Sequence, residues 1–291
     1  MTGIVARFDD WLGEEVGPRR GVVVYVALVV YYGWLLIPIV YLFFSTFKTS
    51  QVIRGSKLIL VPVQNFTLAH WTDVLTRSEF QQFFWNSVIV SSGTTVLAVV
   101  FGTLAAYSVS RMEYPGRGGL IVAFLGTSMF PPVLVLIPFF LIMFQLHIIN
   151  TYVGLIVAMT VITLPFSTWL LKGYFDDIPR ALDDAAKIDG CSEIQTLYRI
   201  IVPLALPGIA VAAFYSFVVS WNNYIFVSIL STSANTRTLP FALQLFQSQH
   251  TIDWGSIVTA ATVTMIPVVV LFAFVQNYLV EGLTSSGMKG P

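Results

Sequence analysis

Charged side chains are scarce in this chain: 10% of its 291 residues are Asp, Glu, Lys or Arg, whereas 56% are hydrophobic. Soluble domains carry about 25% charged residues, because their surfaces must interact with water. A chain this poor in charge is expected to lie in a bilayer. The formal net charge is zero, so no basic surface points to nucleic acid as a partner.

Groups that bind metals or attack substrates are also few. Cys191 is the single cysteine, which excludes an intrachain disulfide and a metal cluster built on several cysteines. The three histidines fall in different loops, without the spacing of a zinc site. The sequence has no Gly-x-x-x-x-Gly-Lys-Ser/Thr phosphate loop, so the chain is not expected to hydrolyse ATP. Mixed charges before the first apolar stretch argue against a cleaved signal peptide.

Long apolar runs are what the chain has in abundance. A spanning helix needs about 20 mainly apolar residues, and a charge at its centre costs about 2.5–3.5 kcal/mol on insertion. Six segments are long enough and have no charged residue or histidine in their interior: 21–47, 85–110, 120–144, 152–171, 204–230 and 256–280. The sequence therefore predicts an all-α membrane protein with six transmembrane helices.

The segments between these spans differ in length. We expect an N-terminal segment (1–20), a first span (21–47), an outer loop (48–84) and a core of five further spans (85–280), followed by a C-terminal tail (281–291). The core contains a long inner loop (172–203) and a long outer loop (231–255). Lys and Arg are concentrated on the side that holds the N-terminus, so the positive-inside rule predicts that both termini are cytoplasmic.

The inner loop has the most structured residue pattern. Pro179 suits a first helical turn, with Asp176 and Asp177 where a helix N-terminus favours negative charge. Apolar residues then recur at helical spacing until Gly190, which is typical of a helix end. A second helix is predicted by two features, a capping box and one apolar stripe: Ser192 with Gln195, and Ile194, Leu197, Tyr198 and Ile201. An alternative is a connector on the membrane surface, but such helices usually carry Lys and Arg rather than Asp.

The same loop carries a family resemblance. The segment DDAAKIDGCSEIQTLYRIIVPLALP resembles the cytoplasmic EAA loop of permease subunits of binding-protein-dependent ABC importers. Asp184 stands where the family has Glu, and Cys191 where it has Ala. The stretch from Trp85 to Arg117 and the ending GLTSSGMKG are similar to carbohydrate permeases, in particular the maltose-type subunit with short periplasmic loops.

This resemblance implies a type I ABC importer permease fold with a cytoplasmic coupling helix, in a prokaryotic inner membrane. The implied substrate is a sugar of di- or oligosaccharide size, delivered by an extracytoplasmic binding protein or lipoprotein. The other implied partners are membrane lipid, a second homologous permease in a heterodimer and two ABC ATPase subunits, which bind ATP and Mg²⁺. The chain itself would bind no cofactor or metal and would not be an enzyme. The sugar's identity would rest largely with the binding protein.

The resemblance also suggests roles for particular residues. Coupling to the ATPase through 179–203 would involve the EAA-like residues: Asp183, Asp184, Ala185, Ala186, Asp189, Gly190 and Cys191. The tail residues Gly287, Met288 and Lys289 would contact the ATPase dimer, and the outer loop 231–255 would dock the binding protein.

Polar residues also occur at mid-depth in the fifth predicted span: Trp221, Asn222, Asn223 and Tyr224. They either line the pathway or bond across helices to the partner permease. In the third span, the prolines at 131, 132 and 138 predict a kink, whether static or a gate. Gly102 and Ala106, four residues apart in the second span, predict close helix packing.

Three alternatives remain open on sequence grounds. An importer of the same class for glycerol 3-phosphate or another polyol would have a similar permease, although phosphate calls for a cationic site and the spans carry no Lys or Arg. An ion-coupled secondary transporter needs ionisable groups near the midplane, which the spans lack. A membrane-embedded enzyme needs a convergent catalytic cluster, and none is evident in the sequence.

Overall fold

The computed structural model describes residues 18–55, 66–247 and 252–287. These residues are organised as helices, and within these ranges strand-type pairing is limited to two isolated bridges, Lys48–Phe66 and Gln247–Ile252. The predicted all-α class is confirmed. The chain divides into two compact units, one of residues 1–73 and 253–262, the other of residues 74–252 and 263–291.

Four of the described helices are long and apolar enough to cross a membrane, and the number rises to six if each of two bent helix pairs is one span. The four are α2 (Pro18–Ser45), α5 (Ser78–Arg111), α8 (Tyr152–Asp177) and α14 (Trp254–Gly287). The helices α5, α8 and α14 continue beyond the predicted spans, because apolar runs indicate only the part of a helix that suits hydrocarbon. The helix α14 therefore includes the first residues of the predicted tail.

The first unit is built on α2, the short α3 (Ser50–Arg54) and the beginnings of α4 (Ala69–Thr76) and α14. Beyond α2 the chain turns around Lys48, which is only 1% exposed. Lys48 Nζ donates to Ser45 Oγ at 3.0 Å and lies 3.9 Å from the centroid of the Tyr41 ring. Burial lowers the pKa of Lys48 from its usual 10.5, because the charged form loses hydration.

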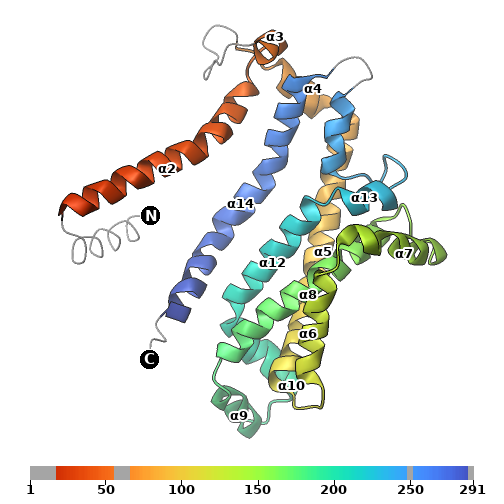
Figure 1. Cartoon of the computed structure of the whole chain (residues 1–291). Coiled ribbons are helices and arrows are strands. Elements are labelled where there is room, and N and C mark those ends of the chain that lie inside the picture. Colours follow the sequence, from red (N-terminus) through yellow and green to blue (C-terminus); the bar gives the residue numbers. More distant parts are fainter. Residues whose placement is uncertain (1–17, 56–65, 248–251, 288–291) are drawn as a thin grey trace. The chain divides into compact units, whose positions relative to one another are not determined.

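The core of the second unit is formed by α5, α8 and α12 (Leu206–Trp221), which lie side by side (Figure 1). Small residues allow this contact. A Cβ at Gly102 would lie 3.4 Å from Leu171 of α8, whereas a Cβ at Gly208 would lie 2.4 Å from the ring of Tyr174, closer than atoms can approach. The predicted close packing at Gly102 thus corresponds to the α5–α8 contact, of the kind that small residues support in membranes.

Hydroxyl groups add polar contacts to this core. Ser167 Oγ and Ser216 Oγ are 3.0 Å apart between α8 and α12, and Ser220 Oγ donates to Thr94 Oγ1 of α5 at 3.4 Å. Such pairs satisfy polar groups where no water is at hand. The three helices are therefore joined by close backbone approach and short polar bridges rather than by charges.

The third predicted span consists of two helices. α6 (Arg117–Ser128) and α7 (Pro132–Gln145) meet at a bend of 99° between Ser128 and Val133. The predicted kink is present, but a single helix over 120–144 is wrong. Pro131 and Pro132 are the reason, since neither has an N–H to continue the ladder of α6, and proline suits the first turn of a new helix. Pro138 lies inside α7 without ending it.

The fifth predicted span is also interrupted. α12 ends at Trp221, and the short α13 (Ile225–Leu230) follows after a break. A continuous helix over 204–230 is therefore wrong. Asn222 Nδ2 donates to Val218 O at 3.0 Å, and Asn223 Oδ1 accepts from the N–H of Phe226 at 3.0 Å, at the start of α13. Asparagine side chains compete in this way with the backbone ladder.

Candidate functional site

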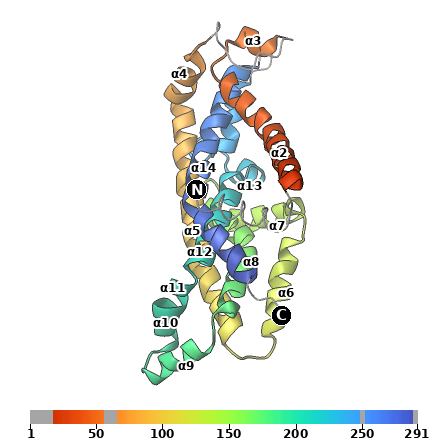
Figure 2. The same ribbon diagram turned by 90° about the vertical axis from the view of Figure 1, so that its left-hand side faces the viewer.

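The inner loop folds into a short helix, α9 (Ala181–Ile188), which lies with α10 (Glu193–Thr196) near the ends of α5 and α8 (Figure 2). Pro179 lies two residues ahead of α9 rather than in its first turn, where it was expected, and its carbonyl oxygen accepts the N–H of Leu182 at 3.2 Å. Asp176 and Asp177 were expected at the N-terminus of this helix, and that is wrong: both belong to the last turn of α8, which continues through Asp177. The acidic residues of the first turn of α9 are Asp183 and Asp184, where the helix dipole favours them.

Gly190 ends α9 in the predicted way. Its φ is +81°, in the left-handed region. The N–H of Gly190 donates to Lys187 O at 3.1 Å, and the N–H of Cys191 donates to Ala186 O at 2.9 Å. These two bonds are those of a Schellman motif, in which the residue after the helix is left-handed and is usually glycine. The bend between α9 and α10 is thus fixed by hydrogen bonds.

The second predicted helix is confirmed, together with its capping box. Ser192 Oγ accepts the N–H of Gln195 at 3.3 Å, and Gln195 Oε1 accepts the N–H of Ser192 at 2.9 Å. The helix then passes through a π-helical stretch, η1 (Leu197–Ile201), and α11 (Val202–Leu204), and bends by 83° into α12. The apolar stripe divides between two faces: Leu197 and Ile201 are buried against α5 and α8, whereas Ile194 and Tyr198 are exposed.

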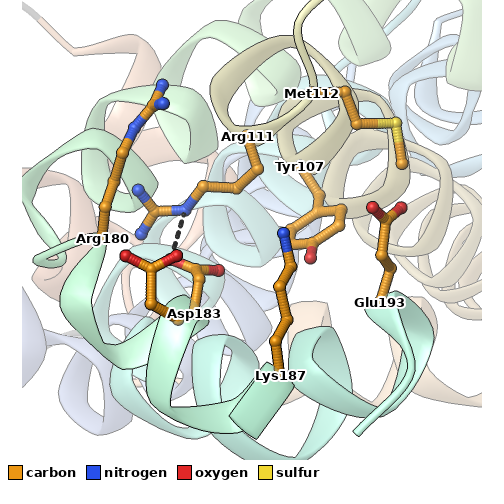
Figure 3. A pocket seen from close by; sticks show the side chains of 8 residues that line it. Tyr107, Arg111, Met112, Arg180, Asp183, Lys187 and Glu193 are labelled. Atoms are coloured by element: carbon orange, nitrogen blue, oxygen red, sulfur yellow. Dashed lines mark ion pairs between the residues drawn. The ribbon is translucent and has the colours of Figure 1, made fainter.

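An ion pair holds the inner face of α9. Arg111 Nε at the end of α5 lies 3.3 Å from Asp183 Oδ2, and the two side chains are 7% and 11% exposed (Figure 3). The attraction is one of charge, because neither Asp183 oxygen nor Arg111 Nε has hydrogen-bond geometry. Removing one partner of a buried pair costs about 3–5 kcal/mol, since the other charge is left buried. Asp183, one of the predicted coupling residues, therefore faces its own chain.

The predicted coupling residues fall on two sides of the loop. Asp183 and Ala186 are buried, and Cys191 is half-buried. Exposed residues make up the rest: Asp184, Ala185, Asp189 and Gly190. Apolar side chains accompany them on the surface, above all Ile188, which is 87% exposed. The exposed side of α9 thus combines carboxylates with an exposed isoleucine at the end of the helix.

The predicted pathway residues lie at the break after α12. Trp221 is 1% exposed; its Nε1 donates to Thr264 O of α14 at 3.1 Å, and its ring stacks on Phe217. Tyr224 stacks on Phe241 of η2 (Leu239–Phe246) and its hydroxyl accepts from Gln244. Asn222 is exposed and Asn223 is half-buried. The structure thus places Trp221 within the core and leaves Asn222 and Tyr224 on the surface of this chain.

The first part of the outer loop, residues 231–247, is held by hydrogen bonds from Asn150, in the turn before α8, and from Asn86 and Ser87 of α5. Asn150 has a positive φ of 57°, and its Oδ1 accepts from the N–H groups of Thr232 and Ser233 and from Thr236 Oγ1. Asn86 Nδ2 of α5 donates to Asn235 O and Arg237 O. Ser87 Oγ accepts the N–H of Leu239 at 2.8 Å. The loop is therefore a built structure attached to α5.

The predicted tail residues lie at the limit of what is described. Gly287 is the last residue of α14, and Met288 and Lys289 lie outside the described residues. The interaction predicted for these three residues stays a prediction.

Sequence reasoning missed the residues that anchor both loops: Arg111, Asn86 and Asn150. Arg111 was counted only as a positive charge at the end of a span, although its place directly after a long apolar run signals the end of a helix. Asn150 tolerates a left-handed backbone better than most residues, and its position at a short turn between spans was the available signal. The polar partners of Asn86 lie about 150 residues away, which no local pattern reveals.

Comparison with known proteins gives a consistent result. Residues 98–285 match the family described as "Binding-protein-dependent transport system inner membrane component". The chain is 37% identical over 257 residues to the inner membrane ABC transporter permease protein YcjP of Escherichia coli (strain K12), covering 88% of this chain and 91% of that protein. It is 36% identical over 258 residues to the trehalose/maltose transport system permease protein MalG of Thermococcus litoralis, covering 88% and 92%.

A solved structure has the same fold. The crystal structure of a bacterial ABC transporter involved in the import of the acidic polysaccharide alginate contains a chain that matches with a TM-score of 0.77 at 23% identity. The match covers 89% of this chain and 95% of that chain.

Proposed function

Because the chain belongs to the family of inner membrane components of binding-protein-dependent transport systems, we propose that it is the permease subunit of an ATP-driven carbohydrate importer. The proposed substrate is a di- or oligosaccharide, in line with the trehalose/maltose system of a relative. A neutral sugar fits the predicted spans, which have no Lys or Arg in their interior, better than glycerol 3-phosphate does.

The exposed side of α9 is the observation that carries this proposal. A short helix that ends in an 87% exposed isoleucine, Ile188, with the exposed carboxylates of Asp184 and Asp189 close to it in the sequence, is an unusual feature to present to water. Burying an isoleucine side chain contributes about 1.5–3 kcal/mol, and carboxylates around it suit a basic rim. We propose that a cytoplasmic ATPase subunit covers this face and that its closure moves α9.

Further subunits complete the proposed assembly. A second, homologous permease forms the other half of the pathway, two ATPase subunits bind ATP and Mg²⁺, and an extracytoplasmic binding protein delivers the sugar. The family description supports the dependence on a binding protein. The distribution of Lys and Arg supports an orientation with α9 and both termini in the cytoplasm.

Reconstitution tests this function. The complex that co-purifies with the chain is placed in proteoliposomes with its binding protein, and uptake of labelled trehalose, maltose and glycerol 3-phosphate is measured. We expect ATP-dependent disaccharide uptake that survives a protonophore. Uptake of glycerol 3-phosphate alone would contradict the sugar assignment. Uptake driven by an ion gradient without ATP would contradict the importer class.

A variant tests the docking face separately. Ile188→Ser removes the exposed apolar side chain at the end of α9, and we expect it to lower ATPase co-purification by about tenfold, which corresponds to about 1.4 kcal/mol. Val153→Ser is the matched control, because Val153 is an exposed apolar residue at the other end of α8. Equal co-purification of the two variants would refute docking at Ile188.

A further inference from the structure

The side chain of Arg111 makes more contacts within the chain than is usual for an arginine at the end of a spanning helix. Its side chain is 7% exposed and lines a cavity of about 210 Å³ between the end of α5 and the helices α9 and α10 (Figure 3). A lysine or arginine at a helix end ordinarily extends into water or along the lipid surface. Arg111 is instead turned toward the inner loop.

One guanidinium joins two parts of that loop. Arg111 Nε pairs with Asp183 in the first turn of α9, and Nη2 donates to Ile178 O at 2.9 Å, at the residue that ends α8. The planar, forked guanidinium can serve two acceptors in fixed directions, whereas a lysine ammonium acts as a single point charge. Arg111 therefore fixes α9 relative to α5 in orientation as well as in distance.

Contacts in the opposite direction reinforce this link. Arg180 Nη2, from the residue before α9, donates to Ser110 O at 3.2 Å, and Ser110 Oγ donates to Asp176 Oδ1 at 2.6 Å. The last two residues of α5 thus hold the chain on both sides of Ile178. We define Ser110, Arg111, Arg180 and Asp183 as the inner clamp.

Apolar packing does little to hold α9. Its buried residues are Asp183 and Ala186 alone, so its attachment depends on the clamp and on the backbone at its two ends. The backbone joins α9 to α8 through residues 178–180 and to α10 through Gly190 and Cys191. The chain provides no backbone connection from α9 to α5, and the clamp supplies that connection through side chains.

We propose that Arg111 is a positioning residue that makes α9 and the cytoplasmic end of α5 move as one body when the ATPase closes. This inference rests on the proposed function and adds to it that movement of α9 reaches α5 through the Arg111–Asp183 pair. Without the Arg111–Asp183 pair, the force that the closing ATPase exerts on α9 would rotate α9 about its backbone connections without moving α5.

The test compares variants in the reconstituted complex, with uptake and ATP hydrolysis measured together. Arg111→Gln is expected to keep ATP hydrolysis and to lower the sugar transported per ATP by at least about tenfold. The transport per ATP of Arg111→Lys should lie between those of wild type and Arg111→Gln, because lysine keeps the positive charge but lacks the forked guanidinium. The reversed pair, Arg111→Asp with Asp183→Arg, should recover part of the loss of Arg111→Asp alone. Arg117→Gln is the control, since Arg117 is a half-buried arginine whose Nη1 donates to Met112 O at the same helix end.

A distance measurement guards against a variant that does not fold. In an otherwise unchanged chain with Cys191→Ser, spin labels at Ala181→Cys and Met112→Cys report on α9 and the end of α5. The label separation should change by less than about 2 Å between the nucleotide-free and ATP-bound complex, a small shift for packed elements. A larger change, or transport per ATP within about twofold of wild type in Arg111→Gln, would overturn the proposal. A wild-type complex that transports nothing would instead refute the proposed function, and the clamp with it.

Discussion

Replacing Gly190 with alanine tests whether the left-handed backbone at this residue maintains the bend after α9. The φ of +81° costs an L-residue about 1–2 kcal/mol. A Cβ at this position would have no heavy atom within 4 Å in this chain, so crowding adds nothing. A destabilisation of this size shifts a two-state population by a factor of about 5–30. We therefore expect the population of the open bend to be larger by that factor in Gly190→Ala.

Amide hydrogen exchange reads this opening directly. The N–H groups at 190 and 191 donate to Lys187 O and Ala186 O, and both bonds break when the bend opens. Their exchange should accelerate by about 5–30-fold in Gly190→Ala, measured on the purified complex. If the bend transmits ATPase closure, sugar transport should fall while ATP hydrolysis continues.

Two further variants separate backbone strain from side-chain bulk. Asparagine tolerates the left-handed region. The N–H groups at 190 and 191 should therefore exchange more slowly in Gly190→Asn than in Gly190→Ala, although the asparagine side chain is larger. Gly173→Ala on α8, where a Cβ also meets no atom within 4 Å, should leave the exchange of the bend unchanged. Unchanged exchange in Gly190→Ala would refute the strain argument. Greater damage from asparagine than from alanine would show that bulk at this surface matters instead.

Three more predictions concern packing, loop anchoring and pH. Gly208→Ala should lower the thermal unfolding midpoint, at a cost of about 1–3 kcal/mol, because its Cβ would meet the Tyr174 ring at 2.4 Å; a midpoint like that of Gly173→Ala would contradict the close contact. Asn150→Ala should make the outer loop more sensitive to protease, since four backbone or hydroxyl donors lose their acceptor; an unchanged cleavage rate would show that other contacts suffice. Lys48 has a lowered pKa, so the unfolded state holds its proton to higher pH than the folded state. Stability should therefore rise with pH as it approaches 10.5 from below; Lys48→Met should abolish this rise in thermal unfolding, and a rise that persists would assign it to another group.

Much of the helical framework follows from the sequence because local physics determines it. Runs without charge locate the spans, since a charged side chain is costly in hydrocarbon. The end of α9 and the start of α10 are equally local: Gly190 is a left-handed C′ residue, and Ser192 and Gln195 form their bonds within one turn. Both of these helix boundaries depend on residues no more than five positions apart.

The breaks and the direction of side chains were harder to predict because they depend on distant partners. The break after Trp221 lies where the side chains of Asn222 and Asn223 form hydrogen bonds with backbone groups, and hydropathy does not register this. Asp183 and Asp184 are neighbours with the same chemistry, yet one is buried and the other exposed. Only the position of Arg111, more than 70 residues earlier, distinguishes them.

The helix α5 is continuous between the residues that hold the two loops, and this has a consequence for how binding at one loop affects binding at the other. Ser87 holds the outer loop and Ser110 holds the inner loop, about 35 Å apart at 1.5 Å per residue. If one placement of α5 is favoured by whatever occupies the outer loop, the same placement alters the affinity of the inner loop for its own partner. Thermodynamic linkage then requires the reverse effect to have equal size. In the proposed assembly, nucleotide-driven closure of the ATPase at the inner loop would change the affinity of the outer loop for the binding protein. The factor would equal the one by which the binding protein promotes closure.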